Sequence, residues 1–478
     1  DGGFNRSSTQ LLYKHNFARQ GKEITTDLTY NTGGGDNWSN ILNNYTLPDG
    51  SEYKPRNRVH NRGNSGNDQW TFQVDYVNPL SENAKLETGL RSYLNNYSSE
   101  YNSFSVAEDD TETKLPLSNN YKYREMVNAL YITYTDKWND IGYQIGLRAE
   151  QSKFDGELVD KSRKFGYSYP DKLNDLFKSF FPSLFLTKEV GDGEEIQLNY
   201  SRRIRRPDFW RLNPFIDIND PVNLRQGNPE LEPEFTNVLE FNYNKNYASG
   251  NFLGVVYYRN NQGDMTQYSD TISQALYEQL DDAAIDPNAI LNTWVNAKSN
   301  NRVGLELTLQ QRLGRQFDFT PTLTMEYRKV NADIKGLNLS NEGFSWESKL
   351  TMNYRIPAPS STLFSNMGIQ TVGRYESPEI IAQGKRKAQY TVDLALRKDL
   401  LKDKRGSVTF SVNDVFDTRK YGVIYDTETF YQDFYRRRNV RSFKVTFSYK
   451  FGNPEFSFFK KDQRRGQRGE DDSEEMMP

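Results

Sequence analysis

Apolar and polar residues alternate along most of this chain with a period of two. Between 344 and 356 one set consists of Phe344, Trp346, Leu350, Met352, Tyr354 and Ile356, and the other contains Glu347, Lys349, Thr351, Asn353 and Arg355. This period places the two sets on opposite faces of a β-strand. No soluble sandwich would bury the second set. The pattern therefore predicts a strand with lipid on one side and a polar interior on the other.

The alternation recurs along the whole chain and predicts about 17 strands. Clear examples lie at 121–134, 141–150, 196–201, 239–243 and 303–309. The connections alternate between short turns of about 3–6 residues and long polar loops of about 8–37 residues, a sorting typical of bacterial outer-membrane barrels. The expected long loops include the Gly- and Asn-rich segment 31–67 and a polar, acidic segment at 95–120.

Together these features predict an all-β fold, a transmembrane antiparallel β-barrel. The last connection, 418–438, is long, so the last strand descends to the periplasm; the first strand also descends, which gives an odd number. Closed bacterial barrels have an even number of strands. We therefore expect a plug and about five further strands to precede this chain and complete a 22-stranded barrel. Residues 1–452 would form the barrel part, and 453–478 a disordered periplasmic tail.

Composition narrows the class further. Only 35% of the 478 residues are hydrophobic and the mean hydropathy is −0.86, but aromatic residues reach 14%, which argues against disorder. No run approaches the roughly 18 apolar residues of a transmembrane helix. Cysteine is absent and the histidines are His15 and His60, which excludes disulfides, thiolate metal sites and cysteine nucleophiles. The net charge of −3, with both signs interspersed, gives no nucleic-acid footprint.

The segment 201–243 is the most distinctive part of the chain. It leaves one alternating strand through an arginine-rich run, crosses a loop with prolines at 207, 214, 221, 229 and 233, and enters the next strand. Proline cannot donate a ladder hydrogen bond, so these residues end strand pairing and stiffen the loop. Alternation places Arg203 and Arg205 on the inward face, where they pair with carboxylates or plug residues, or recognise an anionic ligand. Phe209, Trp210 and Phe215 are candidate ligand contacts at the mouth, beside a purely structural role for the loop.

The same loop offers a group of hard oxygen ligands. Asp217, Asn219, Asp220 and Asn223 lie within seven positions. They lack the spacing and the bidentate glutamate of a calcium-binding loop. We therefore predict no metal site here, and no catalytic or cofactor site elsewhere in the chain.

Several motifs resemble those of one family. Residues 227–234, GNPELEPE, are similar to a signature in the barrels of TonB-dependent outer-membrane receptors, and 200–207 and 210–215 are similar to its Bacteroidota version, the outer membrane protein beta-barrel family. Residues 413–417, NDVFD, resemble the family's penultimate-strand motif, and 146–150, GLRAE, resemble another of its strands. The aromatic-rich last strand also matches, so the resemblance covers about 10–452.

The resemblance implies a Gram-negative outer-membrane receptor that takes up a scarce ligand: a siderophore, a metal complex, a glycan or a peptide. Its partners would be outer-membrane lipid, a plug domain and earlier strands of the same protein, and a TonB-type energy transducer acting through the N-terminal part. A surface lipoprotein or other outer-membrane complex subunits are further candidates. Long loops would be extracellular. The alternative is a non-transporting structural or accessory barrel subunit; an enzyme is disfavoured because neither histidine has a recognisable partner motif.

Overall fold

The computed structural model describes residues 2–116, 118–218, 220, 222–280, 285–334, 336–357, 364–401, 404–437 and 440–451. The predicted tail at 453–478 therefore lies outside the described residues, as do Asn219 and Pro221 of the proline-rich loop. Within the described part, no helix combines the length and the apolar character needed to cross a membrane.

A 19-stranded sheet dominates the fold, and two of its members, β5 (Glu112–Lys114) and β8 (Arg163–Tyr169), are short additions beside β4 and β7. The other seventeen confirm the expected number of strands. They are β1 (Gly2–Asn16), β2 (Glu23–Thr46), β3 (Glu52–Pro79), β4 (Lys85–Val106), β6 (Asn119–Trp138), β7 (Ile141–Leu158), β9 (Phe180–Gly191), β10 (Glu194–Arg205), β13 (Glu234–Tyr247), β14 (Gly250–Gln262), β17 (Ser299–Leu313), β18 (Phe317–Asn331), β21 (Asn341–Arg355), β22 (Met367–Glu376), β25 (Gln389–Leu400), β26 (Gly406–Asn413) and β29 (Ser442–Tyr449).

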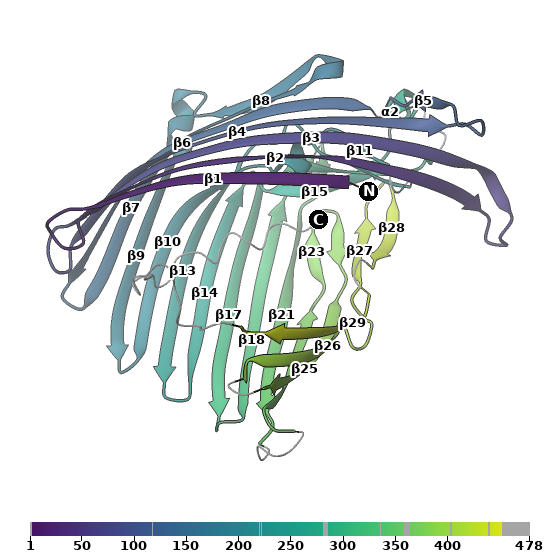
Figure 1. The fold of residues 1–478 in the computed structure, drawn as a ribbon. Coiled ribbons are helices and arrows are strands. Elements are labelled where there is room, and N and C mark those ends of the chain that lie inside the picture. The colour runs from purple at the N-terminus through teal and green to yellow at the C-terminus, as the bar shows by residue number, and fades with distance from the viewer. Residues whose placement is uncertain are drawn as a thin grey trace.

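Each of these strands pairs antiparallel with the next, from β1 beside β2 to β26 beside β29. The sheet curls into a barrel that stays open between β1 and β29, which do not pair with each other in the described residues (Figure 1). Short turns such as 139–140 and 192–193 lie at one end, called here the turn end. The connections 206–233, 263–298 and 414–441 lie at the other, the loop end.

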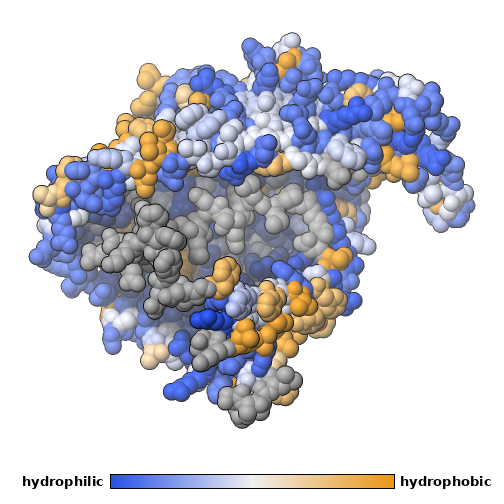
Figure 2. Space-filling model, in the orientation of Figure 1, coloured by the Kyte–Doolittle hydropathy of each residue, from blue (hydrophilic) through white to orange (hydrophobic). Residues whose placement is uncertain are grey.

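The outer face of the barrel is apolar, as the alternation predicts. On β21, Phe344, Trp346 and Leu350 share the outward face, and on β6 Leu130 and Ile132 do the same; all five are exposed. In Figure 2 apolar residues gather over the lower right, where Figure 1 shows β25, β26 and β29. This apolar belt is the surface that a barrel turns toward lipid.

The inner face is mainly polar. A hollow of about 420 Å³ is lined on β10, β13, β14 and β17 by Glu195, Gln197, Glu240, Asn242, Asn244, Leu253, Val255 and Glu306. Arg259 lies between two of these carboxylates, 3.5 Å from Glu240 and 3.7 Å from Glu306. Arg259 thus offsets part of the repulsion between these two carboxylates inside the bore.

Two segments expected to be loops are strands instead. β2 continues to Thr46 and β3 begins at Glu52, so 31–67 is a long hairpin with its turn at 47–51. Similarly, β4 continues to Val106, past the expected loop start at 95. These extensions lie beyond the apolar belt, where neither face has to be apolar and the alternation disappears. Ladder hydrogen bonds between neighbouring strands do not require that alternation, and so the strands continue.

The long connections fold into small sheets at the loop end. The connections after β10 and β14 together form one four-stranded sheet, with the strand order β11 (Ile216–Asp217), β12 (Asn223–Gln226), β16 (Ile290–Asn296), β15 (Met265–Thr271). The connections after β22 and β26 form a second, with the order β23 (Glu379–Ile381), β24 (Gly384–Arg386), β27 (Tyr421–Asp426), β28 (Tyr431–Arg436). The hairpin of β19 (Asp333–Ile334) with β20 (Leu337–Asn338) also lies at the loop end. The described residues of the connections there include the short helices η1 (Val159–Lys161), η2 (Leu173–Ser179), α1 (Phe209–Leu212) and α2 (Gln274–Leu280).

These connections share a hydrophobic core of their own. Leu224 and Ile285, both almost fully buried, pack with Val59 of β3 and with residues of α2 and β11. The Gln432 side chain donates to the Asn223 side chain at 2.7 Å and so ties the two small sheets together. The loop end is therefore a packed assembly.

Candidate functional site

The stretch after β10 folds back on itself through its backbone. The N–H of Gly227 donates to the Asn213 carbonyl at 2.8 Å, and the N–H of Asn228 donates to the Arg211 carbonyl at 2.6 Å. A Cβ at position 227 would lie 2.4 Å from the Asn213 oxygen and 2.7 Å from the Arg211 oxygen, so only glycine allows this approach. Asp208 caps α1 by accepting the Arg211 N–H at 2.9 Å.

The GNPELEPE residues also anchor this stretch to β16 of the next long connection. The Asn228 side chain donates to the Trp294 carbonyl at 3.0 Å. The Asn296 side chain accepts from the Glu232 N–H and donates to the Glu232 carbonyl, both at 2.9 Å. Leu231 is buried in a cluster with Phe154, Leu212 and Met265. The motif thus joins two connections to the barrel wall.

The three predicted aromatic contacts separate into two groups. The Phe209 ring lies 4.6 Å from the Tyr97 ring and 5.8 Å from the Tyr121 ring, measured between centroids, and the Phe215 ring meets Tyr121 edge-on at 6.0 Å. Tyr121 is fully buried. Trp210, in contrast, is 76% exposed. Phe209 and Phe215 pack the loop against the inner wall, whereas the Trp210 ring faces solvent.

The predicted arginines also differ in their surroundings. Arg205 lies 3.4 Å from the buried carboxylate of Glu234. Arg203 is exposed and forms no ion pair within the part of the chain that the structure describes. Arg206, which the sequence analysis did not single out, pairs with the buried Glu150 of β7. The only sequence signals for this pair were an inward glutamate and an arginine before a proline, which do not reveal a contact between residues so far apart in the chain.

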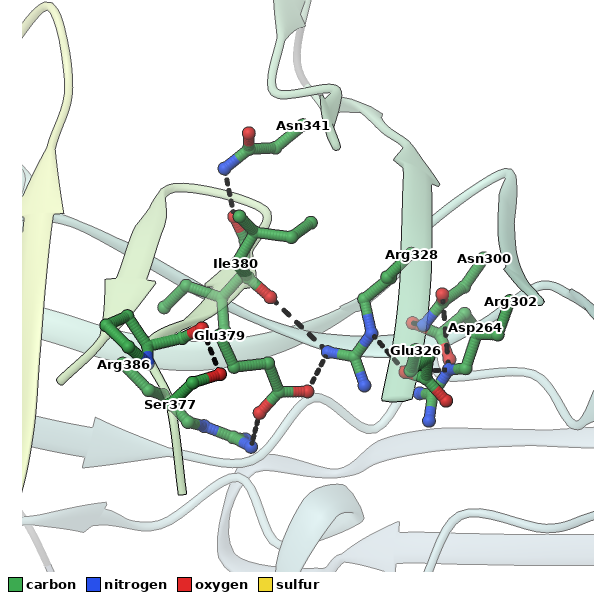
Figure 3. Close-up of polar contacts among 12 residues, drawn as sticks. Asp264, Asn300, Arg302, Glu326, Arg328, Asn341, Ser377, Glu379, Ile380 and Arg386 are labelled. Carbon is green, nitrogen blue, oxygen red and sulfur yellow. Dashed lines mark hydrogen bonds and ion pairs between the residues drawn. The ribbon is translucent and has the colours of Figure 1, made fainter. Parts of the chain in front are cut away.

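A chain of five charged side chains crosses from the barrel wall to the small sheet at the loop end (Figure 3). Arg302 lies 3.9 Å from Glu326, and Arg328 lies 3.5 Å from the same carboxylate. Arg328 reaches across to Glu379 at 2.5 Å, and the second oxygen of Glu379 binds Arg386 at 2.7 Å. Sequence reasoning missed this network because Glu379 and Arg386 lie outside any alternating segment.

Further hydrogen bonds hold the network in place. Tyr257 donates its hydroxyl to Glu326 at 2.9 Å, and Arg328 donates to the Ile380 carbonyl at 3.3 Å. The Asn341 side chain donates to the carbonyls of Ile381 at 2.8 Å and Gly384 at 3.1 Å. Because Arg328 is only 12% exposed, its pairing with Glu379 fixes β23 and β24 to the wall strand β18.

The NDVFD motif forms a tight turn at the loop end of β26. Asp414 has a positive φ of 54° and its side chain accepts the backbone N–H groups of Thr418 at 2.9 Å and Arg419 at 2.8 Å. Burial raises the pKa of Asp414, but these donors outweigh it and hold the pKa below its usual value. Arg437 donates to Asp417, which lowers the pKa of that carboxyl as well. Both aspartates therefore stabilise the turn as carboxylates.

The described residues of the oxygen-rich loop take part in local contacts. Asp217 lies in β11, and Asp220 accepts from the side chain of Asn223 at 3.2 Å and from the Val222 N–H, also at 3.2 Å. Among the described residues, no three His, Cys, Asp or Glu side chains are grouped as metal ligands. His60 pairs with Glu112 at 2.9 Å on the outstretched part of β3. The groups at the mouth are suited to binding by stacking, hydrogen bonding and ion pairing.

The sheet, its apolar outer face, its polar inner face and its folded connections at one end define a transmembrane β-barrel with a covered mouth. The chain belongs to the outer membrane protein beta-barrel family, whose profile matches residues 15–449. No curated protein sequence matches the chain.

Several solved structures have a similar fold. The copper transporter OprC superposes with a TM-score of 0.62 at 13% identity, covering 94% of this chain and 65% of that one. The ferric yersiniabactin uptake receptor FyuA from Yersinia pestis and the ferric citrate transporter FecA each give a TM-score of 0.59 at 11% identity, with 94% and 62% covered. This chain thus spans less than two thirds of each, and at such identities the likeness shows the fold.

Proposed function

We propose that this chain is the barrel of a TonB-dependent receptor that takes up a scarce ligand across the outer membrane. The observation that carries the proposal is the packed loop assembly, anchored by the GNPELEPE residues above a bore with a polar inner face. Such an assembly presents exposed side chains at a mouth while the wall below stays hydrated or filled by protein. The family match and the uptake receptors among the similar structures support it.

The proposal assigns an orientation and partners. The loop end faces the outside of the cell, the turn end and the tail at 453–478 face the periplasm, and the apolar belt contacts membrane lipid. A plug domain and further strands of the same protein fill the bore and complete the wall between β1 and β29. A TonB-type transducer moves the plug, and a surface lipoprotein or another subunit is a candidate partner at the loop end. The protein carries out binding and transport without covalent chemistry.

Ligand contact is assigned to the exposed side chains at the mouth, Trp210 and Arg203. Phe209, Phe215 and Arg205 position the loop beneath them. Replacing Trp210 by alanine should leave the unfolding midpoint almost unchanged and weaken ligand binding, because the ring is 76% exposed and, among the aromatic rings of the described residues, meets only Phe209, edge-on. Replacing Phe209 by alanine should destabilise the loop end, but by less than the roughly 3–5 kcal/mol of a fully buried phenylalanine, because the ring is only half-buried.

Uptake by the full-length protein tests the proposal. Cells with and without the gene are grown with iron, copper, a glycan or a peptide as the limiting nutrient, and uptake is measured before and after the proton-motive force is dissipated. A receptor gives a growth defect on one class of nutrient and energy-dependent uptake of it. An accessory subunit would instead show neither, and would co-purify with a constant set of outer-membrane proteins.

A further inference from the structure

Glu125 of β6 is a carboxyl group that none of the contacts above uses. It lies on the inward face, is largely buried, and is in register with Asn95 of β4 and Phe154 of β7. It forms no ion pair and no hydrogen bond within the part of the chain that the structure describes. A carboxylate taken out of water without a partner is costly. The position of Glu125 therefore favours a cation beside it.

The surroundings of Glu125 are short of hydrogen-bond donors. The Asn95 side chain is 8% exposed and donates to the Tyr123 hydroxyl at 3.2 Å, but its buried Oδ1 has no hydrogen-bond partner among the described residues. Glu125 interacts electrostatically with the phenols of Tyr93, Tyr123 and Tyr167, none of which is a cation. Two neighbouring acceptors thus lack a donor, and a guanidinium group has enough N–H bonds to serve both.

Arg206 is the cation closest to filling this gap. It is the charged group that stabilises the Glu125 carboxylate electrostatically. Its guanidinium lies at the next inward positions of β7, where it pairs with Glu150 and donates to the Ser152 hydroxyl at 2.9 and 3.1 Å. Ser152 is in register with Val127, two residues from Glu125 on β6, which is roughly 7 Å along the strand.

Glu150 remains paired without Arg206. Arg148 contacts the second oxygen of Glu150, at 2.7 Å from Nη2 and 2.8 Å from Nε. Two arginines thus share one glutamate, while the nearby Glu125 has none. Moving Arg206 from Glu150 to Glu125 would give each carboxylate one arginine without changing the net charge. Because both arrangements keep the charges paired, we expect their free energies to lie close together.

The position of Arg206 affects the mouth because this residue is the root of the segment that carries Trp210. Arg206 directly precedes the buried Pro207, whose ring restricts the backbone, and Asp208 caps helix α1, in which Trp210 lies. A proline followed by a capped helical turn is a stiff connection. We therefore expect residues 207–212, called here the Trp210 segment, to move together with Arg206.

We propose that Arg206 is a latch with two positions, one on Glu150 and Ser152 and the other on Glu125 and Asn95. In the second position the Trp210 segment lies nearer the loop end, because Glu125 lies on that side of Glu150. A ligand that contacts Trp210 better in one position shifts the latch toward it. The contact of Trp210 with a ligand rests on the proposed function, whereas the two positions of Arg206 do not depend on any ligand.

A distance between spin labels in the full-length protein tests the latch. This chain has no cysteine, so labels at W210C and D192C, with any cysteine elsewhere in the protein replaced, report the height of the Trp210 segment above the turn end. E150Q removes the carboxylate of the first position and should lengthen this distance by roughly 4–8 Å, from the spacing of neighbouring strands and of inward positions. S152A, a smaller change, should lengthen it in part of the molecules and serves if E150Q does not fold.

The second position is tested by removing Glu125. E125Q should leave only the shorter distance, and E125Q/E150Q should not show the lengthening of E150Q, because Arg206 then has no second carboxylate. D155N is the matched control. Asp155 is exposed on the outward face of β7, 3.0 Å from Lys153, so its neutralisation should give the wild-type distance.

Two results would overturn the latch. One is an unchanged distance in both E150Q and S152A, and the other is a lengthening in E150Q that persists when E125Q is added. The spin-label experiment needs no ligand and is therefore independent of uptake. A latch that moves in a protein without energy-dependent uptake would reject only the proposed function, and uptake by a protein with an unchanged distance would reject only the latch.

Discussion

The lipid-facing role of the apolar belt can be tested at Leu350 of β21. The outward set on this strand runs from Phe344 to Ile356, twelve positions that span roughly 40 Å along the strand and roughly 28 Å along the membrane normal. This agrees with an apolar band about 25 Å tall, and Leu350 is at its centre. The Leu350 side chain is 37% exposed in the protein alone, and the rest is covered by its neighbours across β18 and β22.

Replacing Leu350 by arginine should therefore destabilise the barrel by about 2–4 kcal/mol, the value for a cation at the bilayer midplane. This corresponds to a roughly 30- to 900-fold fall in the ratio of folded to unfolded protein. The measurement is guanidinium unfolding of the full-length protein in phospholipid vesicles, followed by tryptophan fluorescence, with the amount in the outer membrane as a cellular readout.

Thr324 of β18 is the matched control on the opposite face. It pairs in register with Glu306 and Glu347, so an arginine there meets carboxylates in the polar bore. We expect T324R to change the free energy of unfolding by less than about 1 kcal/mol. If L350R and T324R lower stability equally, the two faces have been assigned wrongly and the belt does not meet lipid.

Three further predictions concern the loop end. The chain has no native cysteine, so a membrane-impermeant thiol reagent on intact cells should label E428C and not D192C; the reverse pattern would invert the proposed orientation. Glu379→Gln should speed hydrogen exchange across 377–388, because it removes the carboxylate beside Arg328. The expected loss in the local free energy of opening is about 1–3 kcal/mol. Unchanged exchange would show that this ion pair does not hold the small sheet. Because the pKa of Asp414 is lowered by folding, its contribution to stability is present above the unfolded value and lost as the pH falls through the folded one. The protection of 414–437 against hydrogen exchange, taken relative to the intrinsic exchange rate at each pH, should therefore fall on acidification below about pH 4, and less so in D414N.

How much of the structure can be predicted from the sequence depends on whether a residue lies inside or outside the bilayer. For β21 the alternation alone identifies the strand, both of its faces and the outward position of Leu350. Within the bilayer, each residue must be apolar if it faces lipid and can be polar if it faces the bore, so the sequence records the face of every residue. For 31–67 the same method fails, because beyond the bilayer a strand has no apolar face to mark it. The hairpin there is stabilised by ladder bonds to neighbouring strands, which composition does not report.

The predicted mouth shows the same limit at the level of side chains. Alternation alone places Arg203 and Arg205 on the inward face, and the register agrees. It gave no sign that Arg206 pairs with Glu150, that Phe209 and Phe215 are structural while Trp210 is open, or that Glu379 binds Arg328. These contacts join residues that lie tens of positions apart in the chain, and many of these residues lie in loops without alternating apolar and polar positions.

The sequence by itself determined the class of protein, the number of strands in this chain and the side of the wall on which each strand residue lies. All three follow from a local repeat imposed by lipid on one face and a polar bore on the other. Only the tertiary structure decided which connections pack together at the loop end and which charged groups are left for a partner. Those outcomes depend on register, on turn geometry and on long-range burial, and no short stretch of residues contains them.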